Sequence, residues 1–218
     1  MSRSAGDHER TRDVRGNRST PEAPLSLRER NKLRTRRELL DAALEVFSEQ
    51  GFGSATVEAI AARAGASKVT VYSYFPRGRE ELFQELYEEI NTELIERATT
   101  LYDEEGGPFA RICGLVEIVI DVASRPRIGR FYSIDDPSLD AALDPVRGHA
   151  SGVFIKLMSE DIEAGRVAGT LRATTEADSI ARLLVGAMRA ALTETARRPD
   201  RAGELLAAFA DLVRGLVV

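Results

Sequence analysis

Apolar side chains recur every three or four residues along most of the chain, the spacing of one face of an α-helix. The pattern predicts helices over residues 27–50, 56–64, 67–74, 79–102, 109–124, 145–165, 175–197 and 199–216, about nine in total. Pro126 and the pair Asp136 and Pro137 predict irregular connections, because proline interrupts helices. The sequence shows no alternating strand pattern and no internal repeat, so an all-α fold is expected.

Three segments follow from this pattern. Residues 1–26 contain few large apolar side chains and several arginines, which predicts a flexible basic arm. Residues 27–78 hold short helices separated by glycines and form the first expected domain, and residues 79–218 form a larger helical domain. Whether the arm contacts DNA or only improves solubility is left open by the sequence.

The charge is divided unevenly between the two ends of the chain. The net charge of −5 is unusual for a protein that binds nucleic acid. Residues 1–79 contain 15 Lys and Arg against 10 Asp and Glu, a net of +5, whereas residues 80–218 contain 15 against 25, a net of −10. A basic front and an acidic back favour different tasks for the two parts, although chance clustering of solvated charge produces the same pattern.

The most informative stretch is GFGSATVEAIAARAGASKVTVYSYFPRGREELF, residues 51–83. Thr56 and Ser67 are typical N-cap residues for two short helices, and Gly65 between them tolerates positive φ. Small alanines on the first helix allow close approach of the second, whose inner side is Val71 and Phe75. This is the pattern of a helix-turn-helix.

The same stretch resembles the TetR family of bacterial regulators. The matching residues, in order and spacing, are Thr56, Val57, Ile60, Ala61, Ala64, Gly65, Ser67, Thr70, Tyr72 and Phe75. The sequence departs from the family pattern at Ala55, where Thr is usual, at Ala66, where Val is usual, and at Arg79, where Lys is usual. The resemblance is specific over roughly residues 30–85, with a weaker echo over residues 163–171.

The resemblance implies a dimer on double-stranded DNA, with recognition helices in successive major grooves. The candidate DNA-binding residues are Thr56, Ser67, Lys68, Val69, Thr70, Tyr72, Tyr74 and Arg79. We expect Thr56, Tyr72, Tyr74 and Arg79 to act mainly on phosphates, and Lys68, Val69 and Thr70 to sense bases. The alternatives are that Thr56 is only a cap, that Tyr72 or Tyr74 only packs, and that Val69 is passive.

For the back half, the resemblance implies a small-molecule pocket and dimerisation through the last two long helices. Small and apolar residues alternate in residues 175–197 and 199–216, including Ala187 and Ala191, which suits close helix packing; ordinary core packing is the alternative. The candidate pocket residues are Tyr87, Phe109, Phe131, Tyr132, Phe154 and Met158.

The sequence offers no catalytic, cofactor or metal constellation. His8 and His149 are isolated, and Cys113 is expected to be a core thiol rather than a redox sensor. Asp135, Asp136 and Asp140 are interpreted as turn and cap residues. We expect no cofactor and no enzyme activity, and the polar N-terminus without a secretory signal predicts a cytoplasmic protein.

Two functions fit these expectations. The first is a repressor that a small-molecule effector releases from a palindromic operator. The second is an effector-independent DNA-binding dimer whose C-terminal domain only dimerises or binds a protein partner. An open cavity in the back half favours the first, and a filled core favours the second.

Overall fold

The computed structural model describes residues 26–104, 106–139, 143, 146, 148–171 and 176–216. Within these ranges the chain forms nine α-helices and two 3₁₀-helices and no extended strand, which confirms the all-α expectation. The elements are α1 (Leu27–Ser54), α2 (Val57–Arg63), α3 (Lys68–Tyr74), α4 (Arg79–Asp103), α5 (Pro108–Ser124), α6 (Pro126–Tyr132), η1 (Pro137–Leu139), α8 (His149–Val167), α9 (Ala177–Arg197), η2 (Pro199–Arg201) and α10 (Ala202–Arg214).

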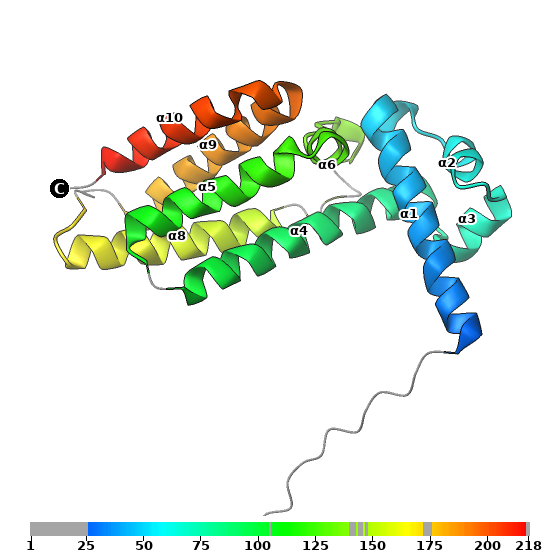
Figure 1. Cartoon of the computed structure of the whole chain (residues 1–218), viewed down its shortest axis with the longest axis horizontal. Helices are drawn as coiled ribbons and strands as arrows, with labels where there is room; N and C mark the ends of the chain where they lie inside the picture. The colour runs from blue at the N-terminus through cyan, green and yellow to red at the C-terminus, as the bar shows by residue number, and fades with distance from the viewer. Residues whose placement is uncertain are drawn as a thin grey trace, which may run out of the picture.

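The molecule is elongated, with α1, α2 and α3 at one end and a bundle of α4, α5, α8, α9 and α10 making up the rest (Figure 1). The long helix α4 begins beside α1 and runs along the bundle. Within the bundle α8 packs on α9, and α10 lies over α5. α6 contacts α1, α5 and α9, so it links the small end to the bundle.

The predicted helices are found with small shifts at their ends. Gly51 interrupts the first helix as expected, because its φ of 72° and ψ of 173° are not helical, and a short helical turn then continues to Ser54. Pro126 does not mark an irregular connection; it starts α6, because proline at the first helical position loses no hydrogen bond. Pro137 similarly begins η1.

The arm prediction falls almost entirely outside the described residues, since these begin at Ser26. Ser26 caps α1 through a capping box with Glu29. None of the helices in the described ranges has the length and apolar character that crossing a membrane requires.

Four phenylalanine rings join the small end to the bundle. Phe47 and Phe52 of α1 contact Phe83 of α4, with ring centroids 5.1 and 5.2 Å away. Phe131 of α6 lies 4.5 Å from Phe83 and 6.0 Å from Phe47. All four side chains are almost completely buried. The core is therefore continuous across the expected domain boundary at residue 78.

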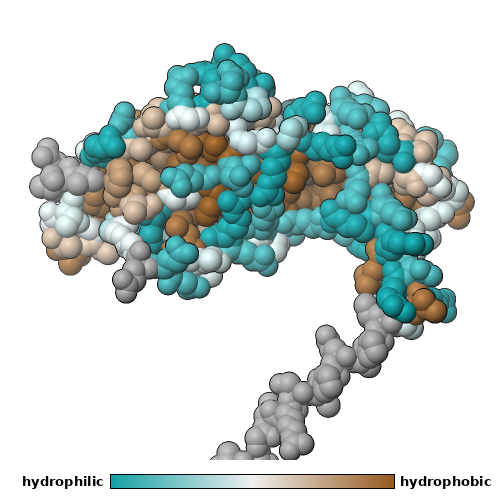
Figure 2. Space-filling view, in the orientation of Figure 1, coloured by the Kyte–Doolittle hydropathy of each residue, from teal (hydrophilic) through white to brown (hydrophobic). Residues whose placement is uncertain are grey.

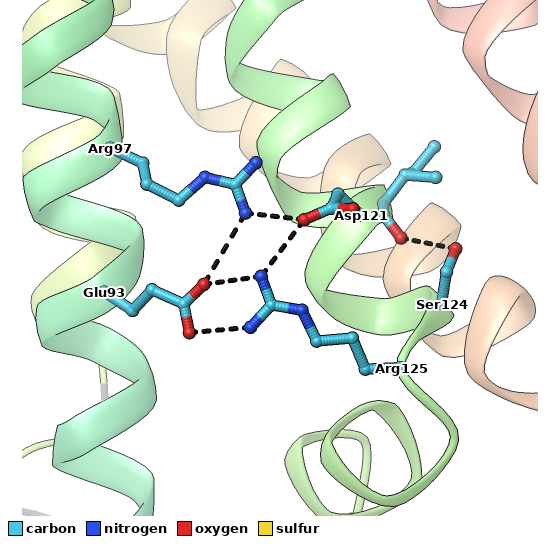
Figure 3. Close-up of polar contacts among 6 residues, drawn as sticks. Glu93, Arg97, Asp121, Ser124 and Arg125 are labelled. Atoms are coloured by element: carbon cyan, nitrogen blue, oxygen red, sulfur yellow. Dashed lines mark hydrogen bonds and ion pairs between the residues drawn. The ribbon is translucent and has the colours of Figure 1, made fainter.

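Two arginines and two carboxylates form a closed ring between α4 and the end of α5 (Figure 3). Arg97 contacts Asp121 at 2.7 Å, and Arg125 contacts Glu93 at 2.7 Å and Asp121 at 3.1 Å. The hydrogen bonds from Arg97 and then Arg125 hold the pKa of Asp121 below its usual value. The ring fixes α4 against the corner where α5 turns into α6, although partial exposure limits its contribution to stability.

Gly129 permits the closest approach between α6 and α5. A Cβ at this position would lie 2.0 Å from the carbonyl oxygen of Ala123, a backbone atom that has little room to move. We therefore expect Gly129→Ala to displace α6 and to lower the free energy of unfolding by about 2–3 kcal/mol, as over-packing of a core does.

Chemical denaturation measures this change. Gly152→Ala is the matched control, because Gly152 is exposed on α8 and its Cβ would meet nothing within 4 Å. The control should be neutral or stabilising by up to about 1 kcal/mol, since alanine favours helix more than glycine does. Equal stability of the two variants would contradict the close approach.

Candidate DNA-binding surface and inner cavity

Local signals build the helix-turn-helix. The side chain of Thr56 accepts the amide of Ala59 at 3.1 Å and caps α2, and Ser67 accepts the amide of Thr70 at 3.1 Å and caps α3. Gly65 adopts φ 64° in the turn. Val71 and Phe75 are fully buried beneath α3. Both predicted caps and the predicted inner face are therefore confirmed.

The opposite face of α3 points to solvent. Ser67, Lys68, Val69 and Tyr72 are exposed, and Val69 is 78% exposed, which is unusual for a valine without a partner. Figure 2 shows apolar surface among hydrophilic atoms at this end of the molecule. Lys68 forms an ion pair with Glu58, so it is not held against the domain core. This arrangement leaves the N-terminal half of α3 available to a groove of DNA.

Two of the predicted contacts are less accessible. Thr70 is half-buried, and its hydroxyl lies 2.9 Å from that of Ser67. Tyr74 is also half-buried, and its carbonyl accepts a hydrogen bond from Arg36 at 3.1 Å.

Arg79 does not have the free charge that the sequence suggested. Its guanidinium lies 4.6 Å above the ring of Phe52. It also donates to the carbonyls of Phe52 and Ala55, at 3.2 and 2.9 Å. These carbonyls end α1, and a cation there stabilises the helix end. Arg79 therefore holds α1 and α4 together, and because these carbonyls leave its charge in place it stays a proposed phosphate contact as well.

A shallow depression lies between α2 and the start of α4. Its volume is about 330 Å³, and its lining includes Thr56, Tyr72 and Gly78 together with the charged residues Glu58, Arg77, Arg79 and Glu80. Gly78 adopts φ 64°, and a Cβ there would lie 3.1 Å from the Tyr72 ring, so this ring rests directly on the glycine. Thr56 and Tyr72 thus present exposed hydroxyls to the same small space, a suitable arrangement for one phosphate group.

Sequence analysis did not single out the first turns of α1. Arg28, Arg30 and Lys32 are exposed, and no carboxylate of the described chain pairs with them. Leu27 and Leu33 of the same turns are 71% and 54% exposed. The close spacing of Arg28, Arg30 and Lys32 in the sequence already indicated that these turns add positive charge to the DNA-binding end.

A cavity of about 170 Å³ lies inside the bundle, walled by α4, α5, α8 and α9. Three of the six candidate pocket residues, Tyr87, Tyr132 and Phe154, line it. The other three do not. Phe131 belongs to the aromatic core described above, Met158 is fully buried elsewhere, and Phe109 lies 5.8 Å beneath the guanidinium of Arg214.

The cavity also contains polar groups that the sequence analysis missed. Asn91 is 1% exposed, and it accepts the hydroxyl of Tyr132 at 2.6 Å and donates to the carbonyl of Val146 at 3.1 Å. Arg189 of α9 lies at the rim. Asn91 could have been found from the sequence, because it directly follows Ile90 within an apolar helical stripe.

A protein with an exposed recognition helix, capped by Ser67 and set at a tight turn after α2, belongs to the helix-turn-helix DNA-binding class. Residues 39–86 match the model of the family described as bacterial regulatory proteins, tetR family. The segment that carries the helix-turn-helix therefore has the sequence of the DNA-binding domain of TetR-family transcriptional regulators.

The chain is also similar in part to curated proteins. The chain is 30% identical over 104 residues to the nucleoid occlusion factor SlmA of Vibrio cholerae, a match that covers 47% of this chain and 53% of that protein. The chain thus spans about half the length of the curated relatives it matches first.

Two solved structures share the fold. One is NalD, the secondary repressor of the MexAB-OprM multidrug efflux pump in Pseudomonas aeruginosa, with a TM-score of 0.66 and 22% identity over 86% of this chain and 98% of that one. The other is a SmeT–triclosan complex, with a TM-score of 0.68 and 22% identity over 85% of this chain and 92% of that one.

The two kinds of DNA contact predict different mutant behaviour. Tyr72→Phe removes a hydroxyl from the depression, so it should weaken binding to every duplex by about tenfold, as loss of one hydrogen bond to a charged group does. Val69→Ala removes apolar contact with a base edge and should reduce discrimination at one base position, by up to about 1–3 kcal/mol.

The measurement is the affinity of each variant for the preferred site and for all its single-base variants. Ser73→Ala is a suitable control, because Ser73 is exposed on α3 but its hydroxyl donates to the carbonyl of Thr70. If Tyr72→Phe relaxes one position while Val69→Ala weakens all sites equally, the proposed orientation of α3 is wrong.

Proposed function

We propose that this TetR-family regulator is a homodimeric repressor that leaves a near-palindromic operator when a small molecule occupies the inner cavity. The observation that carries the proposal is the cavity itself, which lies against the helix that begins at the DNA-binding end. Two similar structures support it, since one is a repressor of a multidrug efflux pump and the other is a complex with triclosan. A bundle with a filled core would instead favour the effector-independent alternative.

The proposed DNA contacts are Thr56, Tyr72 and Arg79 on phosphates, with Tyr74 in a lesser phosphate role. Ser67, Lys68, Val69 and Thr70 are proposed to face bases. The proposed division of the chain is residues 27–78 for DNA binding and residues 79–218 for effector binding and dimerisation. Because the first turns of α4 pack against α1 through Phe83, the two parts are mechanically connected and not independent.

Ring contacts support a path between the cavity and the DNA-binding end. Phe83 contacts both Phe52 of α1 and, at 6.4 Å, Tyr87 one turn along α4. Tyr87 contacts Tyr132 at 4.6 Å, and both tyrosines line the cavity. A ligand that displaces Tyr87 therefore acts on α4, the helix that positions α1. This contact physically connects binding of the small molecule to binding of DNA.

The outer face of α9 supports the dimer. Its buried residues lie on one side, and the opposite side exposes Leu183, Gly186 and Ala190, with Leu183 77% exposed. Leu212 of α10 is 59% exposed. Small residues beside exposed leucines allow two helices of a partner to pack closely.

Ala191, which the sequence analysis placed in this interface, has a different position. It is 6% exposed and belongs to the core of the single chain. A charge there would disrupt folding and would not report on the dimer.

We expect Ala190→Glu to convert the dimer to monomers, because it places a charge at the centre of the exposed stripe. Light scattering measures the mass, and binding to the full operator should fall at least about tenfold. Ala110→Glu is the control, since Ala110 is exposed on α5 outside the stripe. An unaltered dimer in Ala190→Glu would exclude this face.

The operator itself provides a further test. Selection from random duplexes should return two half-sites related by a two-fold axis, because a two-fold dimer presents two copies of α3. Affinity should fall with salt, with a slope of roughly −0.9 per neutralised phosphate. Binding that ignores salt, or no preference over random duplex, would contradict the proposal.

A further inference from the structure

Arg189 is an uncompensated cation at the rim of the inner cavity. It lies on α9 among the lining residues, and no carboxylate of the described residues pairs with it. Arg182, two turns earlier on the same helix, is by contrast held by Asp178 at 2.7 Å. A guanidinium without an ion pair presents donors in a planar fork that matches a carboxylate.

The charge of Arg189 acts on Tyr132, a residue of the cavity wall. Burial raises the pKa of Tyr132, the neighbouring Tyr87 and the carboxylate of Glu88 raise it further, and Arg189 acts in the opposite direction. The hydroxyl of Tyr132 is already directed to Asn91. Arg189 and the tyrosine pair line the same cavity, so an acid group held beside the tyrosines can reach the guanidinium at the rim.

The size and lining of the cavity limit the rest of the ligand. A volume of about 170 Å³ is close to that of an engineered apolar cavity, about 150 Å³, that holds one benzene. Phe154, Tyr87 and Met188 supply aromatic and thioether surfaces that suit a flat ring. Leu94, Val119, Val185 and Leu192 complete the apolar lining.

We infer that the cavity takes a single-ring aromatic carboxylate, with the ring between α4, α5 and α8 and the acid group on Arg189. This inference rests on the proposed function, because it names the ligand class of the same cavity. Asp135 also lines the rim and is exposed. A ring that carries an amine is therefore the competing ligand, and the experiment must separate the two.

The experiment uses the full chain without DNA, so that ligand binding is measured separately from operator release. Benzoate and phenylacetate are titrated beside their neutral amides, benzamide and phenylacetamide, and beside benzylamine, by ligand-observed NMR or calorimetry. For ligands of this size we expect a Kd of roughly 0.1–1 mM for the acids. The amides and the amine should bind at least about fivefold more weakly, because they lack the charge-assisted pair.

Two variants decide which group is responsible. Arg189→Gln should remove the preference for acid over amide, whereas Arg182→Gln, the same substitution on the same helix, should retain it. Ala150→Leu should abolish binding of acid and amide alike, since Ala150 is 5% exposed in the wall and the added atoms fill the cavity. Thermal unfolding and operator binding establish that each variant is folded. If Ala150→Leu does not fold, Arg189→Gln alone tests whether Arg189 binds the acid group.

The inference is overturned if the amine or the amides bind as tightly as the acids, if the native chain binds none of the rings, or if Arg189→Gln keeps the preference. The proposed function fails separately. An acid that binds in the cavity but leaves the operator complex intact supports the ligand class and contradicts effector control. A larger neutral compound that displaces DNA through the cavity supports effector control and contradicts the ligand class.

Discussion

The packing of three phenylalanine rings around Phe83 is the interaction on which the rest of the structure depends. Phe47 and Phe52 come from the DNA-binding end and Phe131 from α6, and all of them meet a side chain on the first turns of α4. Aromatic pairs of this kind contribute about 0.5–1.5 kcal/mol each beyond the area they bury. Arg79 closes the same region by covering Phe52 and binding the carbonyls that end α1. The direction of α1 relative to the bundle is therefore set by a rigid core and not by a linker.

This core lies one helical turn from the cavity. Tyr87 follows Phe83 by four residues, so the two rings lie on the same face of α4, and Asn91 follows by four more. On the far side, Glu93 and Arg97 fix α4 to α5 and to the corner at Arg125 (Figure 3). Under the proposed function, a ligand at Tyr87 thus acts on a helix held by charges at one end and by the phenylalanine core at the other. The short helix α6 ends at Tyr132 and contacts α1, so a displacement of Tyr132 acts directly on the DNA-binding end.

The sequence predicted the parts of this structure that local chemistry determines. Thr56 and Ser67 cap their helices because a hydroxyl at that position satisfies a free amide whatever lies around it, and Gly65 turns the chain for a similarly local reason. Long-range packing decided the rest. A helical pattern shows that Phe131 and Met158 face inward, but it does not show whether core or cavity lies there, and both belong to the core. The fate of Arg79 was equally hidden, because its partners are carbonyls 24 to 27 residues earlier in the chain.

The distribution of charge constrains how such a protein meets DNA. Residues 80–218 carry a net of −10, so the bundle is repelled by phosphates, while the exposed cations of α1 lie beside the recognition helix. This repulsion affects the orientation in which the protein approaches DNA. It disfavours approach of the bundle and permits approach of the end formed by α1, α2 and α3. In a dimer formed by the outer face of α9, the two acidic bundles adjoin, and mutual repulsion opposes the association that the exposed leucines favour. Added salt then has opposite effects on the two equilibria, because it screens the repulsion between bundles and weakens the attraction of α1 to phosphates. The salt dependence of operator binding therefore reports on the DNA contacts only when the protein concentration is high enough for all of the protein to be dimeric.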